Sequence, residues 1–269
     1  MSQQFSKNDY IQWAQGKGLL PSDLNKFKLL YESNLSNINN TIEKSDVRSD
    51  IGMWLHQAGH KYLHDTNFIL SDSFELKILL KPFDSTIEKL YRKDCLLNNK
   101  FNPDNIDNLI NHRTLYNRID DLFRTRIITR YVDGPGFVVD FIRDKLASTH
   151  NIEINERKLA TQAGYHGQHV YIPFDSTILI EDDNGLVTKE IVVYFEIQFY
   201  TRMQDLMREL THGIYEQNRV TRGKNQDWKW DFGSQEFKAG YLGQTLHMLD
   251  AMLLELRDTV DTNKDVDDE

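Results

Sequence analysis

The chain has 269 residues, of which 39% are hydrophobic and 27% are charged, and its formal net charge is −9. These proportions suit a globular protein with a sizeable core. No apolar run approaches the roughly 20 residues of a membrane-spanning helix, and the start, MSQQFSKNDYIQWAQ, lacks the pattern of a secretory signal. We therefore expect a cytoplasmic protein with no membrane partner. The single cysteine, Cys95, excludes an internal disulfide and is predicted to pack rather than react.

Charge is distributed unevenly along the sequence. The last twelve residues, DTVDTNKDVDDE, hold six acids and one lysine, a composition typical of a solvated, disordered tail. In contrast, five arginines lie within eighteen residues that contain only two acids; they are Arg113, Arg118, Arg124, Arg126 and Arg130. This arginine cluster is compatible with an anionic ligand despite the acidic balance of the whole chain.

The first half of the chain is predicted to begin with a helical extension over residues 1–70, with helices at 8–16, 22–41 and 46–64, the last capped by Ser45 or Asp46. The segment FELKILLKPF (74–83) has the composition of a strand. A helix follows it, because Ser85 and Glu88 have capping-box spacing. Another helix is expected over 102–117, since proline is well tolerated in a first turn.

Strands and helices alternate in the second half. FRTRIITRYV is predicted as a strand, DGPG as a turn and 137–147 as a helix. QHVYIPF, TILIE and EIVVYFEIQFY are predicted as strands, the last two joined in a hairpin by the turn DDNG, and helices are expected over 202–219 and 236–257. This order predicts an α/β or α+β fold with one main domain over 71–257 and a disordered acidic tail over 258–269.

The segment YFEIQFYT (194–201) alternates strictly between a polar and an apolar series. In a strand, alternate side chains point to opposite faces, so Glu196 and Gln198 stand together on one face with a tyrosine on either side. Alternation alone leaves open whether this face is simply solvated or lines a site.

Three histidines, His56, His60 and His64, lie at i, i+4 and i+8 and form one helical stripe. The first two have the spacing of a zinc-protease helix, but Gln57 stands where that chemistry needs a glutamate as general base. We interpret the stripe as half-buried structural histidines beside Trp54 rather than as a metal site.

Two stretches combine basic side chains with groups suited to anions or metals. LLKPFDSTIEKLYRK places Lys81 at a strand end, Ser85 at a helix start and Lys89 on the same helical face, where the helix dipole favours phosphate; a solvated basic helix is the alternative. RIDDLFRTRIITR places Asp121 before a strand whose arginines share one face. That carboxylate can hold Mg²⁺ and the arginines phosphate; an exposed, charged edge strand is the alternative.

The stretch GYHGQHVYIPF supplies Gly164 and Gly167 around Tyr165, followed by His169. Glycine lets a backbone turn sharply or approach a ligand, and an exposed tyrosine can stack on a base. A loop with a packed tyrosine is the alternative.

Together and in this order, these motifs resemble the synthetase domain of RelA/SpoT-type nucleotide pyrophosphokinases. The resemblance covers residues 74–219, and its most specific parts are GYHGQH and FEIQFYT. It implies the nucleotidyltransferase-like fold of that domain, a mixed, mostly five-stranded sheet flanked by helices. It also implies an Mg²⁺-dependent enzyme that transfers the β,γ-pyrophosphate of ATP to a ribose 3′-hydroxyl and releases AMP.

The resemblance implies roles for individual residues. ATP would be bound by Lys81, Ser85, Lys89, Arg92 and Arg126. Asp121 and Glu196 would be the magnesium ligands and catalytic carboxylates, with Glu196 activating the 3′-hydroxyl. Tyr165 would stack on the base of the acceptor, and His169 and Gln198 would line the same cleft.

Three positions depart from the family pattern. Leu79, Arg124 and Tyr200 stand where the family usually has arginine, glycine and arginine, respectively. They affect the expected contacts with adenine and with the acceptor. Leu79 and Tyr200 also favour, as an alternative function, a catalytically silent nucleotide- or partner-binding module.

The C-terminal segments TRMQDLMRELTHGIYEQNR and FKAGYLGQTLHMLDAMLLELRD resemble the toxic small alarmone synthetases of toxin–antitoxin and phage-defence modules. This implies a growth-inhibiting enzyme with the 3′-CCA end of tRNA as acceptor and an antitoxin protein as partner. The tRNA would bind a basic surface to which five residues contribute: Arg202, Arg208, Arg219, Arg222 and Lys224. The alternative is a synthetase of guanosine or adenosine alarmones that uses GDP, GTP or adenosine nucleotides. Some relatives are homotetramers, so a homo-oligomer is a further expectation.

Overall fold

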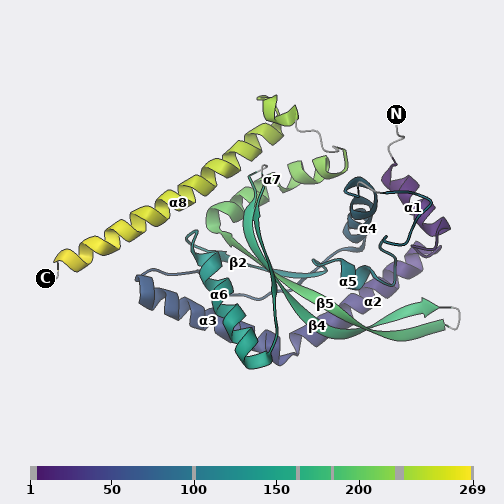
Figure 1. Ribbon diagram of the computed structural model, residues 1–269, viewed down its shortest axis with the longest axis horizontal. Coiled ribbons are helices and arrows are strands. Elements are labelled where there is room, and N and C mark those ends of the chain that lie inside the picture. The colour runs from purple at the N-terminus through teal and green to yellow at the C-terminus, as the bar shows by residue number, and fades with distance from the viewer. Residues whose placement is uncertain (1–4, 99–100, 162–163, 183–184, 222–226, 268–269) are drawn as a thin grey trace. The chain divides into compact units, whose positions relative to one another are not determined.

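The computed structural model describes residues 5–98, 101–161, 164–182, 185–221 and 227–267. Its α-helices are α1 (Lys7–Gly16), α2 (Leu24–Glu43), α3 (Asp46–Thr66), α4 (Phe83–Tyr91), α5 (Leu115–Arg118), α6 (Gly134–His150), α7 (Arg202–Thr221) and α8 (Gln235–Asp267) (Figure 1). A π-helix, η1 (Arg92–Leu96), and a 3-10 helix, η2 (Asp227–Trp230), complete the helical elements of the described residues. The strands are β1 (Leu79–Leu80), β2 (Phe123–Thr129), β3 (Asn155–Ala160), β4 (His166–Asp182) and β5 (Gly185–Thr201), and they form a sheet in the order β1-β2-β5-β4-β3.

The chain divides into two compact units. The first unit contains Met1–Lys44, Ile78–Arg124 and Pro173–Glu196, and the second contains Ser45–Lys77, Thr125–Ile172 and Ile197–Glu269. Within the first unit α1 and α2 contact α4; within the second, α3 contacts α6 and α7 contacts α8. The two units therefore cut across the boundary predicted near residue 70, because the N-terminal helices pack in different units.

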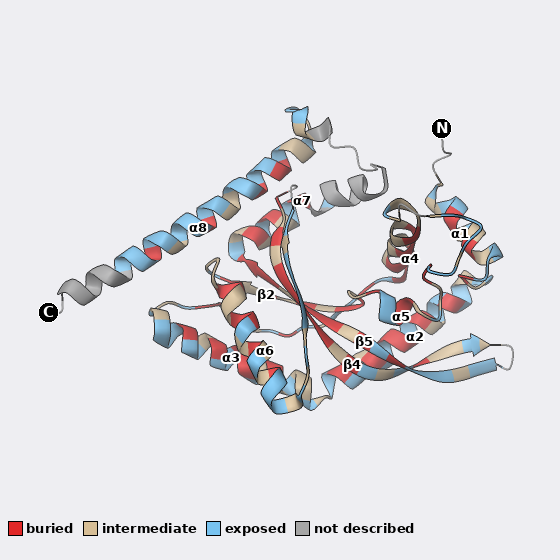
Figure 2. Ribbon diagram, in the orientation of Figure 1, coloured by how far each residue is buried: buried red, intermediate tan, exposed pale blue. Residues whose placement is uncertain are grey.

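Each unit has an apolar core of its own, red in Figure 2. Core residues of the first unit include Tyr31, Ile38, Leu90, Leu115, Phe123 and Phe195; those of the second include Ile51, Leu55, Val139, Leu146, Ile172 and Phe199. Along β2 every second residue is buried, from Phe123 to Thr129. Since β2 lies between β1 and β5 in the sheet, the edge-strand alternative for this segment is wrong.

The three N-terminal helices are confirmed within two residues of their predicted bounds. The N-cap of α3 is Ser45, whose Oγ accepts a hydrogen bond from the Arg48 backbone N–H at 3.2 Å. A serine oxygen at this position satisfies one of the free N–H groups of the first turn. Of the two predicted caps, Ser45 or Asp46, the structure therefore selects Ser45.

The helix predicted over residues 102–117 is largely wrong, because the structure has turns up to the short helix α5. Asparagine side chains bind backbone N–H groups that a helix would use: Asn102 accepts from Asp104 at 2.9 Å, and Asn105 accepts from Asp107 at 3.0 Å. Asparagine competes with helix formation in this way.

The region around Pro82 also differs from prediction. Of the strand expected over 74–83, only Leu79–Leu80 pairs as β1. Helix α4 begins at Phe83 with Pro82 as its N-cap and no side-chain cap, so the predicted capping box of Ser85 and Glu88 is wrong. Proline donates no N–H to a strand ladder, which explains why pairing stops there.

The second half shows four further differences. Helix α6 begins at Gly134, so the predicted turn DGPG already belongs to its first turn, where Pro135 is well placed. Strand β3 was not predicted, because most of its side chains are polar and exposed. The two short strands predicted within 168–181 are one long strand, β4. Helix α8 continues to Asp267, which corrects the disordered tail up to that residue, because extending an existing helix costs far less than nucleating one.

In the described part of the chain, no helix is both long and apolar enough to cross a membrane.

Candidate active site

The first unit brings together two lysines and one carboxylate from separate elements. Strand pairing places them: Leu79 pairs with Arg124, Leu80 with Phe123, and the Lys81 backbone N–H donates to the Leu122 carbonyl at 2.9 Å. Lys81 therefore lies beside the residues that precede β2.

The carboxylate of Asp121 accepts one hydrogen bond from each lysine. Lys81 Nζ is 2.9 Å from Asp121 Oδ2, and Lys89 Nζ, from α4, is 2.8 Å from Asp121 Oδ1. The three side chains are only 8%, 20% and 17% exposed, in the order Lys81, Lys89 and Asp121, so these ion pairs are largely shielded from water. Charge-assisted hydrogen bonds of this kind are stronger than neutral ones.

The surroundings lower the pKa values of both Asp121 and Lys81. A lower pKa favours the charged form of the aspartate but the neutral form of the lysine. Burial alone would raise the pKa of the Asp121 carboxyl, but the ammonium groups of Lys89 and Lys81 outweigh burial and hold the pKa well below its ordinary value. Burial also lowers the pKa of Lys81, against the opposing effect of Asp121. Asp121 is thus ionised at physiological pH.

A tyrosine of the N-terminal helices is hydrogen-bonded to the backbone of Lys81. The Tyr31 hydroxyl, from α2, donates to the Lys81 carbonyl at 2.8 Å and lies 2.7 Å from Thr86 Oγ1 in the first turns of α4. Tyr31 is 1% exposed, and burial raises the pKa of its hydroxyl. Nothing in the sequence pairs Tyr31 with Lys81, so sequence reasoning missed this support.

The other expected residues of the first unit lie on neighbouring elements. Ser85 is half-buried in the first turn of α4, and Arg92 opens η1, with its Nε 3.6 Å from Glu88 Oε1. A π-turn inside a helical segment is common at functional sites. Glu196 lies on β5 and is 3% exposed. A carboxylate buried to this degree is rare unless it has a specific role or partner.

The first unit contains carboxylates of the kind that hold magnesium. Mg²⁺ is usually held by one or two carboxylates together with substrate phosphates and water, and Asp121 is kept ionised by its surroundings. Asp121 and Glu196 would be its protein ligands. Within the described residues, no three histidine, cysteine, aspartate or glutamate side chains form a ready-made metal cluster.

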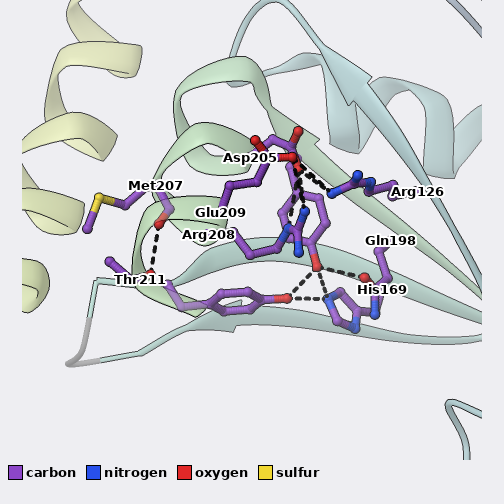
Figure 3. A network of polar contacts seen from close by, with 10 residues as sticks. Arg126, His169, Gln198, Asp205, Met207, Arg208, Glu209 and Thr211 are labelled. Carbon is purple, nitrogen blue, oxygen red and sulfur yellow. Dashed lines mark hydrogen bonds and ion pairs between the residues drawn. The ribbon is translucent and has the colours of Figure 1, made fainter. Parts of the chain in front are cut away.

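The second unit gathers the expected acceptor residues in one network of polar contacts (Figure 3). The Tyr165 hydroxyl lies 2.7 Å from His169 Nε2 and 2.6 Å from the Tyr200 hydroxyl. The Tyr200 hydroxyl in turn donates to Gln198 Oε1 at 2.9 Å. Tyr171 is a further neighbour of the imidazole, with its hydroxyl 3.5 Å from His169 Nδ1.

Tyr200 holds the centre of this network although the sequence identified it only as a departure from the family pattern. It is 1% exposed, and a Cβ atom at Gly167 would lie 2.6 Å from its ring. Only glycine leaves room for the ring at that position. The signal that could have revealed this contact is the pair of glycines around Tyr165.

Arg126, expected to bind ATP, belongs to the second unit and is ion-paired there. Its Nη1 lies 3.0 Å from Asp205 Oδ1 and 3.7 Å from Glu209 Oε1, both on α7 (Figure 3). Arg208 also contacts Asp205, at 3.1 Å. Sequence reasoning missed Asp205 and Glu209, although the i, i+3 spacing of Asp205 and Arg208 was a signal for an ion pair on α7.

The basic surface expected for tRNA is partly neutralised in the described residues. Besides Arg208, Arg202 pairs with an acid, Asp72, at 2.7 Å. Arg219, Arg222 and Lys224 lie outside the described side chains.

Two other expectations concern residues away from these groups. His56, His60 and His64 are exposed rather than half-buried, so the interpretation of a half-buried stripe is wrong; their face of α3 points to solvent. Burial raises the pKa of the Cys95 thiol to about 12, which leaves it protonated and unreactive at neutral pH.

Acid unfolding tests the electrostatics of Asp121. Because its folded pKa lies below the ordinary value of 3.8, the ionised carboxylate stabilises the fold above 3.8, and this contribution is lost as pH falls from 3.8 through the folded pKa. The difference in free energy of unfolding between wild type and Asp121→Asn should therefore be constant from about pH 7 to about pH 5 and shrink only at lower pH. Denaturant titrations at stepped pH measure it; a difference that already shrinks above pH 5 contradicts the lowered pKa.

Comparison with known proteins gives structural but not sequence matches. No family model and no curated protein sequence matches the chain. A GTP pyrophosphokinase family protein from Streptococcus pneumoniae is 18% identical, with a TM-score of 0.53 over 87% of this chain and 95% of its own. Small alarmone synthetase 1 from Bacillus subtilis is 17% identical, with a TM-score of 0.54 over 86% of this chain and 97% of its own; bound to its product pppGpp, it is 16% identical and gives 0.52 over the same shares. The chain therefore has the fold of the small alarmone synthetases, and the predicted five-stranded sheet flanked by helices is confirmed.

Proposed function

We propose that the protein is an ATP pyrophosphokinase that transfers the β,γ-pyrophosphate of ATP to a ribose 3′-hydroxyl. The observation that carries the proposal is the ionised Asp121 held between Lys81 and Lys89, within a fold shared with pyrophosphokinases. Phosphoryl-type transfer depends on positioned cations and metal-binding carboxylates around the phosphates. Two lysines from different elements, fixed by one carboxylate, meet that need.

The residues of the first unit would bind the donor and activate the attacking hydroxyl. Lys81 and Lys89 would bind the ATP phosphates, with Ser85 and Arg92 from α4 and η1. Glu196 would take the proton of the 3′-hydroxyl as its oxygen forms a bond to the β-phosphorus. The bond between that phosphorus and the oxygen of the α-phosphate breaks, and AMP leaves. Bound Mg²⁺ would supply charge neutralisation of the phosphate oxygens.

We propose the 3′-terminal ribose of tRNA as the acceptor. The Tyr165 network consists of tyrosine hydroxyls, an imidazole and a carboxamide, and the nearby Arg126 and Arg208 are paired with Asp205. The hydroxyls, imidazole and carboxamide would contact the terminal nucleoside, and the resemblance of the C-terminal segments to the toxic small alarmone synthetases supports tRNA as its source. The tRNA phosphates would need cations beyond Arg126 and Arg208. On this proposal the protein inhibits growth by blocking tRNA, and an antitoxin protein would control it.

A guanosine nucleotide is the second candidate acceptor. It is favoured by the fold, because one protein of the same fold was solved with its product pppGpp. The 5′-phosphates would then require basic residues beyond those paired with acids in the described network.

An assay with labelled ATP decides between the acceptors. The purified protein is incubated with Mg²⁺, ATP labelled at the γ-phosphate, and either bulk tRNA or GDP. We expect label in tRNA that is lost when the tRNA 3′-terminal ribose has been oxidised with periodate. Label only in the guanosine nucleotide would contradict the tRNA proposal but retain the pyrophosphokinase, and no label in either would favour a catalytically silent binding module.

A further inference from the structure

Helix α8 runs against the segment that carries Tyr165, in the second unit. The helix contributes Gly240, Gly243 and His247, which lie three and four residues apart and therefore share one face. This face contacts backbone and side chains on both sides of Tyr165. The same helix is bonded to the end of β5, where Thr201 Oγ1 donates to Asp250 Oδ2 at 2.5 Å.

The closest part of this contact is made by glycine backbones. Gly164 has φ +79°, a conformation that L side chains rarely adopt, and a Cβ atom there would lie 2.5 Å from the Gly240 carbonyl oxygen. A Cβ atom at Gly243 would lie 2.4 Å from the Gly164 carbonyl oxygen. Both clashes are with backbone atoms, which cannot rotate away as a flexible side chain can. Glycine at both positions is what allows this approach.

Two side-chain contacts flank the glycines. The rings of His166 and His247 stack at 3.8 Å with an interplanar angle of 8°. Burial, and then the neighbouring His247, lower the pKa of His166, so charge repulsion does not break the stack at neutral pH. On the other side, Gln244 Nε2 donates to the Thr161 carbonyl at 2.8 Å.

We propose that Gly243 and His247 are positioning residues that set where Tyr165 stands, and thereby control binding of the acceptor nucleoside. The Tyr165 hydroxyl is held by His169 and Tyr200, and the residues on either side of Tyr165, Gly164 and His166, contact α8. The inference rests on the proposed function, in which Tyr165 stacks on the acceptor base. It assigns to α8 a role in acceptor specificity that is separate from the ATP-binding residues of the first unit.

The test is a matched pair of glycine substitutions, Gly243→Ala on α8 and Gly213→Ala on α7. Both replace a helical glycine and raise helix propensity alike, but a Cβ at Gly213 meets nothing within 4 Å. We expect Gly243→Ala to raise the KM for the acceptor by at least about tenfold. Displacing a positioning group by about 1 Å can lower an enzyme's reaction rate on the order of 10²-fold. The KM for ATP should not change, and Gly213→Ala should match wild type for both substrates.

Two further variants separate positioning from general damage. His247→Phe keeps a flat ring for the stack and should retain acceptor KM, whereas His247→Ala should raise it. In a Tyr165→Phe background, Gly243→Ala should raise the acceptor KM by a smaller factor than it does in wild type, because both changes act on one side chain. The inference would be overturned if Gly243→Ala raised the KM values for ATP and for the acceptor equally. It would also be overturned if the effects of Gly243→Ala and Tyr165→Phe on the acceptor KM were fully additive.

Hydrogen exchange gives a readout that does not depend on activity. The backbone amides of residues 165–169 should exchange faster in Gly243→Ala than in wild type or Gly213→Ala, because the segment loses its support. Unchanged exchange would overturn the inference. If wild type transfers label to no acceptor while exchange still responds to Gly243→Ala, the proposed function fails and the positioning contact stands.

Discussion

Replacing Glu196 by glutamine is expected to lower the rate of pyrophosphate transfer by ~10²-fold or more, the usual effect of removing a positioned general base. Glutamine has nearly the same shape, so the fold around this 3% exposed side chain should be retained. Transfer is measured with γ-labelled ATP, and ATP binding is measured by calorimetry with a non-hydrolysable analogue. Binding without Mg²⁺ should change little, because the base acts on the acceptor hydroxyl.

The control for Glu196→Gln is Glu190→Gln, which makes the same chemical change on the same face of β5. Glu190 is exposed, so its replacement should leave transfer at the wild-type rate. If expression of Glu196→Gln still stops growth as wild type does, the protein acts by binding rather than by catalysis. Wild-type transfer by purified Glu196→Gln would exclude this residue as the base.

Asp121→Asn is expected to have the second-largest effect, on both activity and stability. It leaves the ammonium groups of Lys81 and Lys89 without the carboxylate that both contact and removes a magnesium ligand. We expect transfer to fall by ~10²-fold or more and the free energy of unfolding to fall by about 2 kcal/mol, as for a largely buried charged hydrogen-bond partner. Denaturant unfolding and the label assay measure the two effects.

A double variant separates these two consequences. Lys89→Met combined with Asp121→Asn removes one of the two unpaired ammonium groups, so it should recover part of the lost stability but none of the activity. Asp107→Asn, an exposed aspartate of the same unit, should match wild type in both measurements. A double variant no more stable than Asp121→Asn alone would show that the unpaired ammonium group of Lys89 does not cause the loss of stability.

The sequence predicted the candidate site best where residues close in the chain act together. Glu196, Gln198 and Tyr200 are placed by the period of two in a strand, and Ser85 and Lys89 by the period of a helix. That Lys81, Lys89 and Asp121 belong to one site was predicted only because the order of the motifs resembles that of a known family. The resemblance could not predict that both lysines bind one carboxylate, since the register of β1 on β2 sets that contact.

Prediction was poorest where side chains compete with secondary structure or where pairing is short. Asn102 and Asn105 bind their own backbone and prevent the helix predicted over 102–117, while β1 is reduced to two residues before Pro82. Arg126 was assigned to ATP through the resemblance to a family, but the acids of α7 that pair with it are far away in sequence.

The sequence by itself determined the fold class and most of the helices and strands, and it named candidate site residues, because hydrophobic periodicity, caps and motifs are local properties of the chain. Only the tertiary structure decided which charges neutralise each other, that Tyr31 supports Lys81, that Tyr200 joins Tyr165 and His169, and that α8 packs on Gly164. These contacts join residues distant in sequence. They depend on strand register and close backbone approach, which no local pattern encodes.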